Sequence, residues 1–348
     1  MSDVERDPSR FGSVDKSDSI NEVFRERHER FIPAAGEQLK TPTTFEVEVC
    51  DETLTVDYRV LDLPEAAEEH AGPNAEPVVV LQGFGSGWEG IAELGFSIAS
   101  EGRKTILVSL PGEGNSDNPS EAYWNGEGFK NEAEVVTALI KHLKEQGVVT
   151  SESTHLVGHS QGSEVITQLA VDHPELVSSL VLLNPAGVRE EDPVLPLATR
   201  FLASGAYTNL EFKGRLAFSG EDDYERALDP YIPKTKSPFA KDRLSQRRAE
   251  ATKLASGHLL EKLQRISKPV TFIGGELDSV YPPGALDDAS SQLARVVEAV
   301  QGHALINTSV MAELRHNTTQ APDEITAVNI DHYLEVAEKH NRGETSVS

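Results

Sequence analysis

The stretch THLVGHSQGSEVI, residues 154–166, decides the fold because it joins an apolar strand, a sharp turn and the start of a helix. The apolar run ends at Gly158-His159-Ser160-Gln161-Gly162, and apolar residues at helical spacing follow at once. Such a turn can hold a serine above a sheet, and its tight packing requires small residues two positions before and after the serine. Gly158 and Gly162 meet this requirement, so the stretch predicts Ser160 as a nucleophile.

Short, continuously apolar segments alternate with segments of helical period on both sides of this turn. Continuous apolar strands between helices are typical of a parallel sheet that is covered on both faces. The expected strands are 77–83, 104–110, 154–160, 178–187, 268–275 and 294–300. The expected helices are 90–102, 131–147, 163–173, a segment around 284–294 and a last helix that begins near Pro322.

The flanking segments have different patterns. Residues 44–63 form two alternating runs joined at Asp51-Glu52, which predicts a β-hairpin. An amphipathic helix is expected within 20–32, and it either docks on the core or mediates association.

The segment 188–267 breaks the rhythm of the core, because it is irregular and charged yet carries scattered aromatic and leucine residues. An insertion between core strands predicts a helical lid rather than an independent fold. The expected domains are a polar extension (1–40), the core (41–187 and 268–341), the inserted cap or lid (188–267) and a flexible tail (342–348).

Composition excludes several classes of partner. The 348 residues carry a formal net charge of −25, and both nucleic acid and anionic membrane surfaces require a basic footprint instead. The acidic residues are spread along the chain, which indicates solubility or adaptation to high salt. The N-terminal segment is too charged for a signal peptide, and no apolar run approaches the length of a membrane span. We therefore expect a cytoplasmic protein with no nucleic-acid partner and no membrane insertion.

Cys50 is the one cysteine, so the sequence excludes an intrachain disulfide and a cysteine-rich metal site. Its position in an alternating run indicates a small buried or edge hydrophobe rather than a nucleophile. The glycine-rich segment GFGSG, 83–87, lacks the Gly-Lys-Ser/Thr ending of a nucleotide loop and the full Gly-x-Gly-x-x-Gly of a dinucleotide fold. Neither a cofactor nor a metal is therefore expected.

A serine hydroxyl needs a base, an acid that orients the base, and donors for the developing oxyanion. On the Gly158–Gly162 turn and its flanking elements the chain resembles the α/β-hydrolase family, from about Phe45 to Leu334. The resemblance implies a mostly parallel central sheet of about eight strands, helices on both faces and an inserted helical cap. It also implies the chain order Ser, then Asp or Glu, then His, with the acid and the base on loops after later strands.

The resemblance places the acid in GGELDSVYPP, 274–283, where Asp278 follows an expected strand and Glu276 is the competitor. It places the base at His303, just past the expected strand 294–300, and a neutral imidazole suits that task. His316 and His332 are rivals in position but lie in helix-like surroundings. The stretch from His303 to the last helix is long for the family, which keeps His316 as the lesser candidate.

The resemblance assigns the oxyanion hole to the backbone N–H groups of Gln161 and of Phe84, which follows Gly83. His159, beside the nucleophile, is expected to be structural. Three residues depart from the family pattern at positions that orient loops: Gln82, Ser109 and Ser163.

The expected function is a cofactor-independent serine hydrolase that cleaves an ester or related acyl bond of a neutral, partly apolar small molecule. A carbon–carbon bond hydrolase, a perhydrolase or cofactorless haloperoxidase, an iminopeptidase and an acyltransferase use the same triad and remain alternatives. A non-catalytic ligand-binding protein on this fold is another. The sequence leaves the oligomeric state and the natural substrate open.

Overall fold

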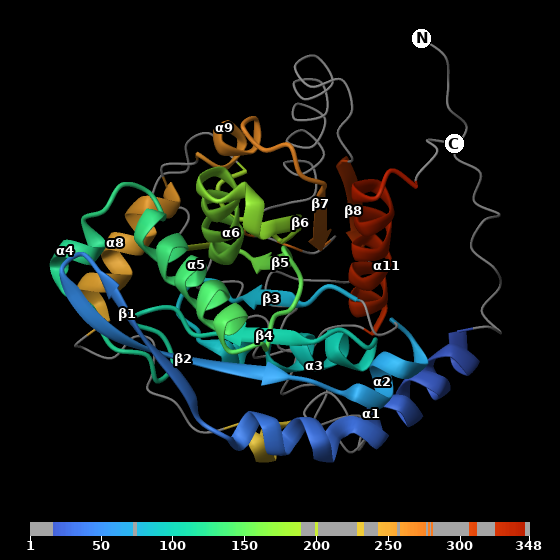
Figure 1. Cartoon of the computed structure of the whole chain (residues 1–348). Helices are drawn as coiled ribbons and strands as arrows, with labels where there is room; N and C mark the ends of the chain where they lie inside the picture. Colours follow the sequence, from blue (N-terminus) through green and yellow to red (C-terminus); the bar gives the residue numbers. More distant parts are fainter. Residues whose placement is uncertain are drawn as a thin grey trace, which may run out of the picture.

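The chain folds into an eight-stranded, mostly parallel sheet with helices on both faces, in the order β1-β2-β4-β3-β5-β6-β7-β8 (Figure 1). The structure is a computed structural model that describes residues 17–71, 75–188, 199–200, 228–232, 243–255, 258–275, 278, 280, 306–311 and 324–344. From β3 to β8 neighbouring strands are parallel, whereas β1, β2 and β4 pair antiparallel. The expected fold class is thus confirmed.

The strands are β1 (Thr43–Val49), β2 (Glu52–Leu61), β3 (Val78–Leu81), β4 (Thr105–Val108), β5 (Thr154–His159), β6 (Val177–Leu183), β7 (Val270–Gly275) and β8 (Ile306–Met311). The α-helices are α1 (Ser17–Lys40), α2 (Pro64–Glu69), α3 (Ala92–Ser100), α4 (Glu121–Trp124), α5 (Lys130–Glu145), α6 (Gln161–Asp172), α8 (Leu244–Ala255), α9 (Leu259–Leu263) and α11 (Glu324–Asn341). The 3-10 helices are η3 (Trp88–Ile91), η4 (Pro174–Leu176) and η6 (Asp229–Tyr231).

Five of the six expected core strands are present, with shorter bounds than expected, and the expected strand 294–300 and the helix around 284–294 lie outside the described residues. The structure places an unpredicted strand, β8, after them and pairs it parallel with β7. The last helix begins at Glu324, close to the expected start near Pro322.

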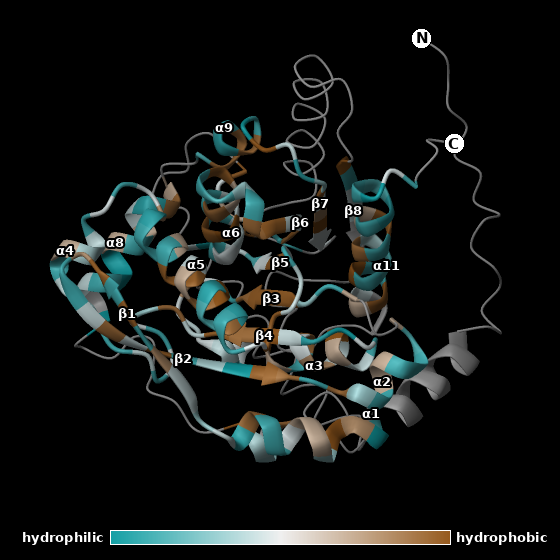
Figure 2. Cartoon of the chain, in the orientation of Figure 1, coloured by the Kyte–Doolittle hydropathy of each residue, from teal (hydrophilic) through white to brown (hydrophobic). Residues whose placement is uncertain are grey.

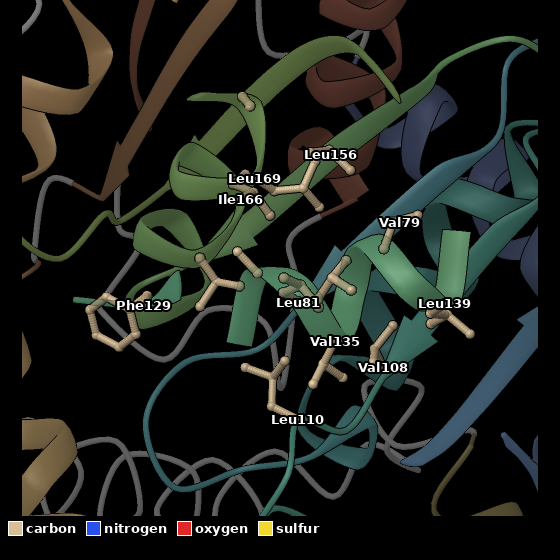
Figure 3. Packing of buried hydrophobic residues seen from close by; sticks show 14 of the residues in the cluster. Val79, Leu81, Val108, Leu110, Phe129, Val135, Leu139, Leu156, Ile166 and Leu169 are labelled. Atoms are coloured by element: carbon tan, nitrogen blue, oxygen red, sulfur yellow. The ribbon is translucent and has the colours of Figure 1, made fainter. Parts of the chain in front are cut away.

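Strands β3 to β7 contribute to two separate hydrophobic clusters, because successive side chains point to opposite faces. Val79 and Leu81 pack with α5, α6, α8 and α9, while Val78 and Val80 pack with α1, α3 and α11. Figure 3 shows the first cluster, in which Val79, Leu81, Val108 and Leu156 of the sheet meet Val135, Leu139, Ile166 and Leu169 of α5 and α6. The hydrophobic interior of the sheet contrasts with the hydrophilic outer faces of α5 and α6 (Figure 2).

The expected hairpin forms between β1 and β2, but its turn is at Cys50-Asp51, one residue earlier than expected. Both residues have a positive φ, 52° for Cys50 and 58° for Asp51. Cys50 is exposed in this turn. The expectation of a buried or edge position is therefore wrong, because the alternating run ends at Val49.

The described part of helix α1 docks on the core, which is one of the two roles that the sequence left open for the helix expected within 20–32. Phe31, Ala35 and Leu39 recur every four residues and are buried against the α3 face of the sheet. Pro33 lies inside α1 without ending it.

Candidate active site

Ser160 lies at the turn between β5 and α6 and has an unusual backbone conformation, with φ 50° and ψ −115°. Its N–H donates to the carbonyl of Leu183 at 2.9 Å, and its carbonyl accepts from the N–H of Ala186 at 3.1 Å. These bonds to the end of β6 hold a conformation that costs about 1–3 kcal/mol for a non-glycine residue. Only 3% of Ser160 is exposed. The serine therefore lies under other parts of the chain.

The two glycines that flank Ser160 are required by close backbone contacts. A Cβ on Gly158 would lie 2.6 Å from the carbonyl oxygen of Gly162, and a Cβ on Gly162 would lie 2.6 Å from the carbonyl oxygen of Leu81. Atoms at such distances overlap, so only glycine fits at either position. Strand β3, strand β5 and helix α6 meet at this point, as the strand–turn–helix pattern predicts.

The loop after β3 lies directly beside the serine. A Cβ on Gly83 would be 2.8 Å from Cβ of Ser160, which places Phe84 next to the turn. Gln161, the first residue of α6, is 3% exposed. The two residues expected to supply the oxyanion donors thus belong to segments that border Ser160.

The departures from the family pattern have hydrogen-bonding partners in this region. Oε1 of Gln82 lies 3.0 Å from Nδ1 of the buried His159, and Ser163 Oγ donates to the carbonyl of Gly158 at 2.6 Å. Ser109 Oγ accepts the N–H of Trp88 at 2.9 Å. All three side chains hold loops or turns in place, as the sequence analysis expected of them.

Asp278 follows the carboxyl end of β7 and is 2% exposed. Its N–H donates to the carbonyl of Gly275 at 3.1 Å, and its Oδ1 accepts the N–H of Val280 at 2.8 Å. Asn184, at the end of β6, accepts the N–H of Gly275 at 2.8 Å and so ties this loop to the strand next to Ser160. The competitor Glu276 lies outside the described residues.

The parallel register brings the ends of four strands to one edge of the sheet. His159 is level with Leu183, Leu183 with Ile273, and Ile273 with Ser309. Ser160 and Asp278 are therefore at the same edge, with the chain after β6 between them. The residues that follow Met311 also leave β8 at this edge.

His303 lies outside the described residues, so its assignment as the base stays a prediction. The prediction assumed that His303 follows the last strand, whereas β8 begins at Ile306 and therefore comes after it.

The two rival histidines differ in position. His332 is exposed in the middle of α11, away from a strand end. His316 lies outside the described residues, five positions after Met311 and eight before Glu324. The short spacing from His316 to the last helix is the sequence signal that favours it.

A buried charged cluster that sequence analysis missed also borders the site. It consists of Glu113 in the loop after β4 and of Arg247 and Glu250 on α8. Each of the three side chains is at most 5% exposed. No local pattern reveals this cluster, because 134 positions separate Glu113 from Arg247.

Among the described residues, no group of three or more histidine, cysteine or acidic side chains is arranged to hold a metal ion. Within the same part of the chain, no helix is long and apolar enough to cross a membrane.

Comparison with known proteins supports the fold and a hydrolytic activity. The sequence model of the alpha/beta hydrolase fold matches residues 76–306. A pimeloyl-[acyl-carrier protein] methyl ester esterase of Aeromonas hydrophila is 30% identical over 244 residues, 65% of this chain and 88% of its own length. The uncharacterized hydrolase YugF of Bacillus subtilis is 24% identical over 62% of this chain and 77% of its own length. Among solved structures, one from a study of Nitrososphaera gargenis carboxylesterases has a TM-score of 0.56 at 13% identity, covering 85% of this chain and 100% of its own.

Proposed function

Because the chain belongs to the α/β-hydrolase fold family, we propose that it is a serine hydrolase that cleaves an ester or related acyl bond. The observation that carries the proposal is Ser160, held at φ 50° between Gly158 and Gly162 at the edge of the sheet where Asp278 also lies. In the catalytic members of this family, a turn of this shape presents a nucleophile beside backbone donors.

In the proposed reaction, Ser160 Oγ attacks the substrate carbonyl while a histidine takes the hydroxyl proton. The N–H groups of Phe84 and Gln161 stabilise the oxyanion of the tetrahedral intermediate, and the loss of one such donor costs about 3 kcal/mol. The histidine then returns the proton to the leaving alcohol, and an acyl-enzyme remains. Asp278 orients the imidazole and stabilises its charged form, and water releases the acid by the same route.

We assign the base to His316 in place of His303. Both residues carry an imidazole, but only His316 follows the carboxyl end of β8, the strand beside the one that precedes Asp278. In the chain order Ser160, Asp278, His316, each residue then follows a strand at one edge of the sheet, which the triad requires.

The substrate class is inferred from the relatives and from the covering of the site. The Aeromonas hydrophila relative is by name a methyl ester esterase, which favours an acyl ester here. The low exposure of Ser160 supports a covered site, and we propose that the segment 188–267 forms the lid between the two core segments 41–187 and 268–341. Its aromatic and aliphatic residues would favour a neutral, partly apolar acyl substrate.

A comparison of His316→Ala with His303→Ala tests the proposal and the choice of base together. With p-nitrophenyl butyrate as substrate, His316→Ala should lower kcat by about a thousandfold or more, since the members of a triad act as a unit. His303→Ala is the matched control and should stay within about threefold of the wild type. Loss of turnover in His303→Ala alone would refute the assignment of the base, and an inactive wild-type protein would refute the esterase proposal.

A further inference from the structure

The buried charged cluster between α8 and the core has no role in the proposed triad. The guanidinium of Arg247 binds both carboxylate oxygens of Glu113, with Nη2 donating to Oε2 at 2.7 Å, and its Nη1 also donates to Oε2 of Glu250 at 2.6 Å. Arg243 extends the cluster by donating to the carbonyl of Gly114 at 3.2 Å. Helix α8 is thus joined to the loop after β4 by charged groups with almost no access to water.

The same cluster contacts the loop that would supply one oxyanion donor. Glu113 Oε1 accepts the N–H of Gly85 at 3.2 Å, and the guanidinium of Arg247 lies 5.4 Å from the centre of the Phe84 ring. Glu113 is therefore bound from one side by the Phe84–Gly85 segment and from the other by α8. A displacement of Arg247 would release both contacts at once.

The second donor segment is connected to α8 as well. Glu250 has a side-chain hydrogen bond with Gln161, the residue after the nucleophile. Oε1 of Gln161 is buried without a hydrogen-bond partner, so the amide nitrogen is the atom that bonds Glu250. The two segments expected to stabilise the oxyanion therefore share one helix as their common support.

Stability alone does not explain a cluster of this kind. Burial, followed by the charge of Glu250, raises the pKa of Glu113, and the contacts with Arg247 oppose this rise. Burial also raises the pKa of Glu250. A protein in which well-packed apolar residues replace a buried ion pair is often as stable as the original or more stable. What a buried ion pair adds is hydrogen bonds of defined direction. Here those contacts end on the backbone of the oxyanion loop.

We propose that Glu113 and Arg247 are positioning residues for the hydrolysis: Arg247 of α8 holds Glu113, and Glu113 holds the Phe84–Gly85 segment where its backbone meets the developing oxyanion. The inference rests on the proposed function, because it concerns the oxyanion hole of that reaction. Donors fixed before the reaction stabilise the oxyanion without rearranging, so a loosened loop lowers the rate of the chemical step. Substrate binding changes much less.

The kinetic test compares variants at Glu113 and Arg247 with a matched variant on the same helix. Lys253→Met removes another buried ion pair of α8, that of Lys253 Nζ with Glu132 Oε1 at 2.9 Å, and Glu132 lies on α5 rather than in the loop after β4. Arg247→Met and Glu113→Ala should lower kcat on p-nitrophenyl butyrate by about 10- to 100-fold with KM within about threefold, while Lys253→Met keeps kcat within about twofold. Glu113→Gln, which keeps an acceptor for Gly85, and Arg247→Lys, which keeps one charged donor, should give intermediate values.

A second measurement follows the loop itself and does not depend on turnover. Hydrogen–deuterium exchange of the peptide that contains Phe84 and Gly85 should accelerate in Arg247→Met and Arg247→Lys and stay unchanged in Lys253→Met. If the exchange does not change, the positioning contact is refuted whatever the activity.

Equal losses of kcat in Arg247→Met and Lys253→Met, at matched losses of melting temperature, would show that the cluster only stabilises the fold and would overturn the inference. If Arg247→Met does not fold, Arg247→Lys and Glu113→Gln decide by the same criteria. A wild-type protein without esterase activity would refute the proposed function separately, because the exchange measurement reports on the loop alone.

Discussion

Ser160 combines an unfavourable backbone conformation with the proposed role of nucleophile. Its left-handed φ of 50° is unfavourable for a side chain with a Cβ, yet bonds to Leu183 and Ala186 hold it there. The same bonds fix the serine to the end of β6, the strand between β5 and the one before Asp278. The strained conformation of Ser160 is thus held by hydrogen bonds to the elements that carry the rest of the candidate site.

The glycines around Ser160 allow a stability prediction at the level of single residues. Gly158→Ala should destabilise the protein by about 2 kcal/mol or more, because its Cβ would meet backbone atoms of Gly162 and Ser163 that have no room to move. Urea unfolding followed by circular dichroism measures the loss.

Gly147→Ala is the matched control for this prediction. Gly147 has a φ of 69° but nothing within 4 Å of its Cβ position, so alanine there costs only about 1 kcal/mol of backbone strain. A Gly158→Ala protein as stable as the wild type, or no less stable than Gly147→Ala, would contradict the packing described at this turn.

The residue types of the site were predictable from sequence to different degrees. The turn of Ser160 with Gly158 and Gly162 was predictable because the serine and the two small residues that its tight packing requires lie within five consecutive positions. Gln82 was recognised only as a departure, and its contact with His159 needed the fold because 77 positions separate them. Contacts between side chains far apart in the sequence leave no local pattern.

Helix α11 is attached to the core by ion pairs with Arg103 and His155, and it allows a prediction about pH. The side chain of Arg103 is 1% exposed. Its Nε lies 2.5 Å from Oδ1 of Asp331, and its Nη1 lies 2.6 Å from Oε1 of Glu338. Burial alone would raise the pKa of Glu338, but hydrogen bonds and charges from His155 and Arg103 outweigh it and lower the pKa to about 2. The carboxylate form is therefore favoured by folding.

Because the pKa of Glu338 is lower in the folded state, its carboxylate stabilises the fold fully at pH values above the unfolded pKa, near 4.5. This stabilisation is lost as the pH falls toward the folded pKa of about 2. Glu338→Gln should lower the free energy of unfolding by about 3 kcal/mol at pH 6, and the difference from the wild type should shrink steadily between pH 4.5 and pH 2. Denaturant titrations at a series of pH values measure it.

Glu335→Gln on the same helix is the control for the pH prediction. The side chain of Glu335 is 45% exposed, and its Oε2 lies 3.8 Å from Nζ of Lys339. Glu335→Gln should therefore change the free energy of unfolding by less than about 0.5 kcal/mol across this pH range. A difference between wild type and Glu338→Gln that is independent of pH, or as small as that of Glu335→Gln, would refute the role given to Arg103 and His155.

The strand bounds show why sequence reasoning overlooked β8. The segment 294–300 is mostly apolar, whereas β8 contains Asn307 and Thr308 and is partly exposed because it lies at the edge of the sheet. An edge strand needs less apolar surface than a central one, so a polar strand next to an apolar segment is easily overlooked. The helix expected within 20–32 continues to Lys40 with Pro33 inside it, and Ala35 and Leu39 of the extra turns are buried against the core.

At the scale of the whole molecule, the sheet and its two covered faces follow from sequence because continuous apolar strands need helices on both sides. The attachment of α8 and α9 does not follow in this way. Lysines 253 and 262 bind Glu132 and Glu164 of the core, and in each pair the carboxylate is at most 3% exposed. Sequence analysis assigns charged side chains to the surface, because they are rarely buried. Buried ion pairs between distant elements are therefore found only once the fold is known.

Labelling with a fluorophosphonate probe tests the central claim, that Ser160 is an activated nucleophile, most directly. The probe should modify the native protein at one site, with the adduct located on the peptide that contains Ser160, and Ser160→Ala and the unfolded protein should remain unlabelled. Undiminished labelling of Ser160→Ala, or an adduct on a different serine of the native protein, would contradict the account.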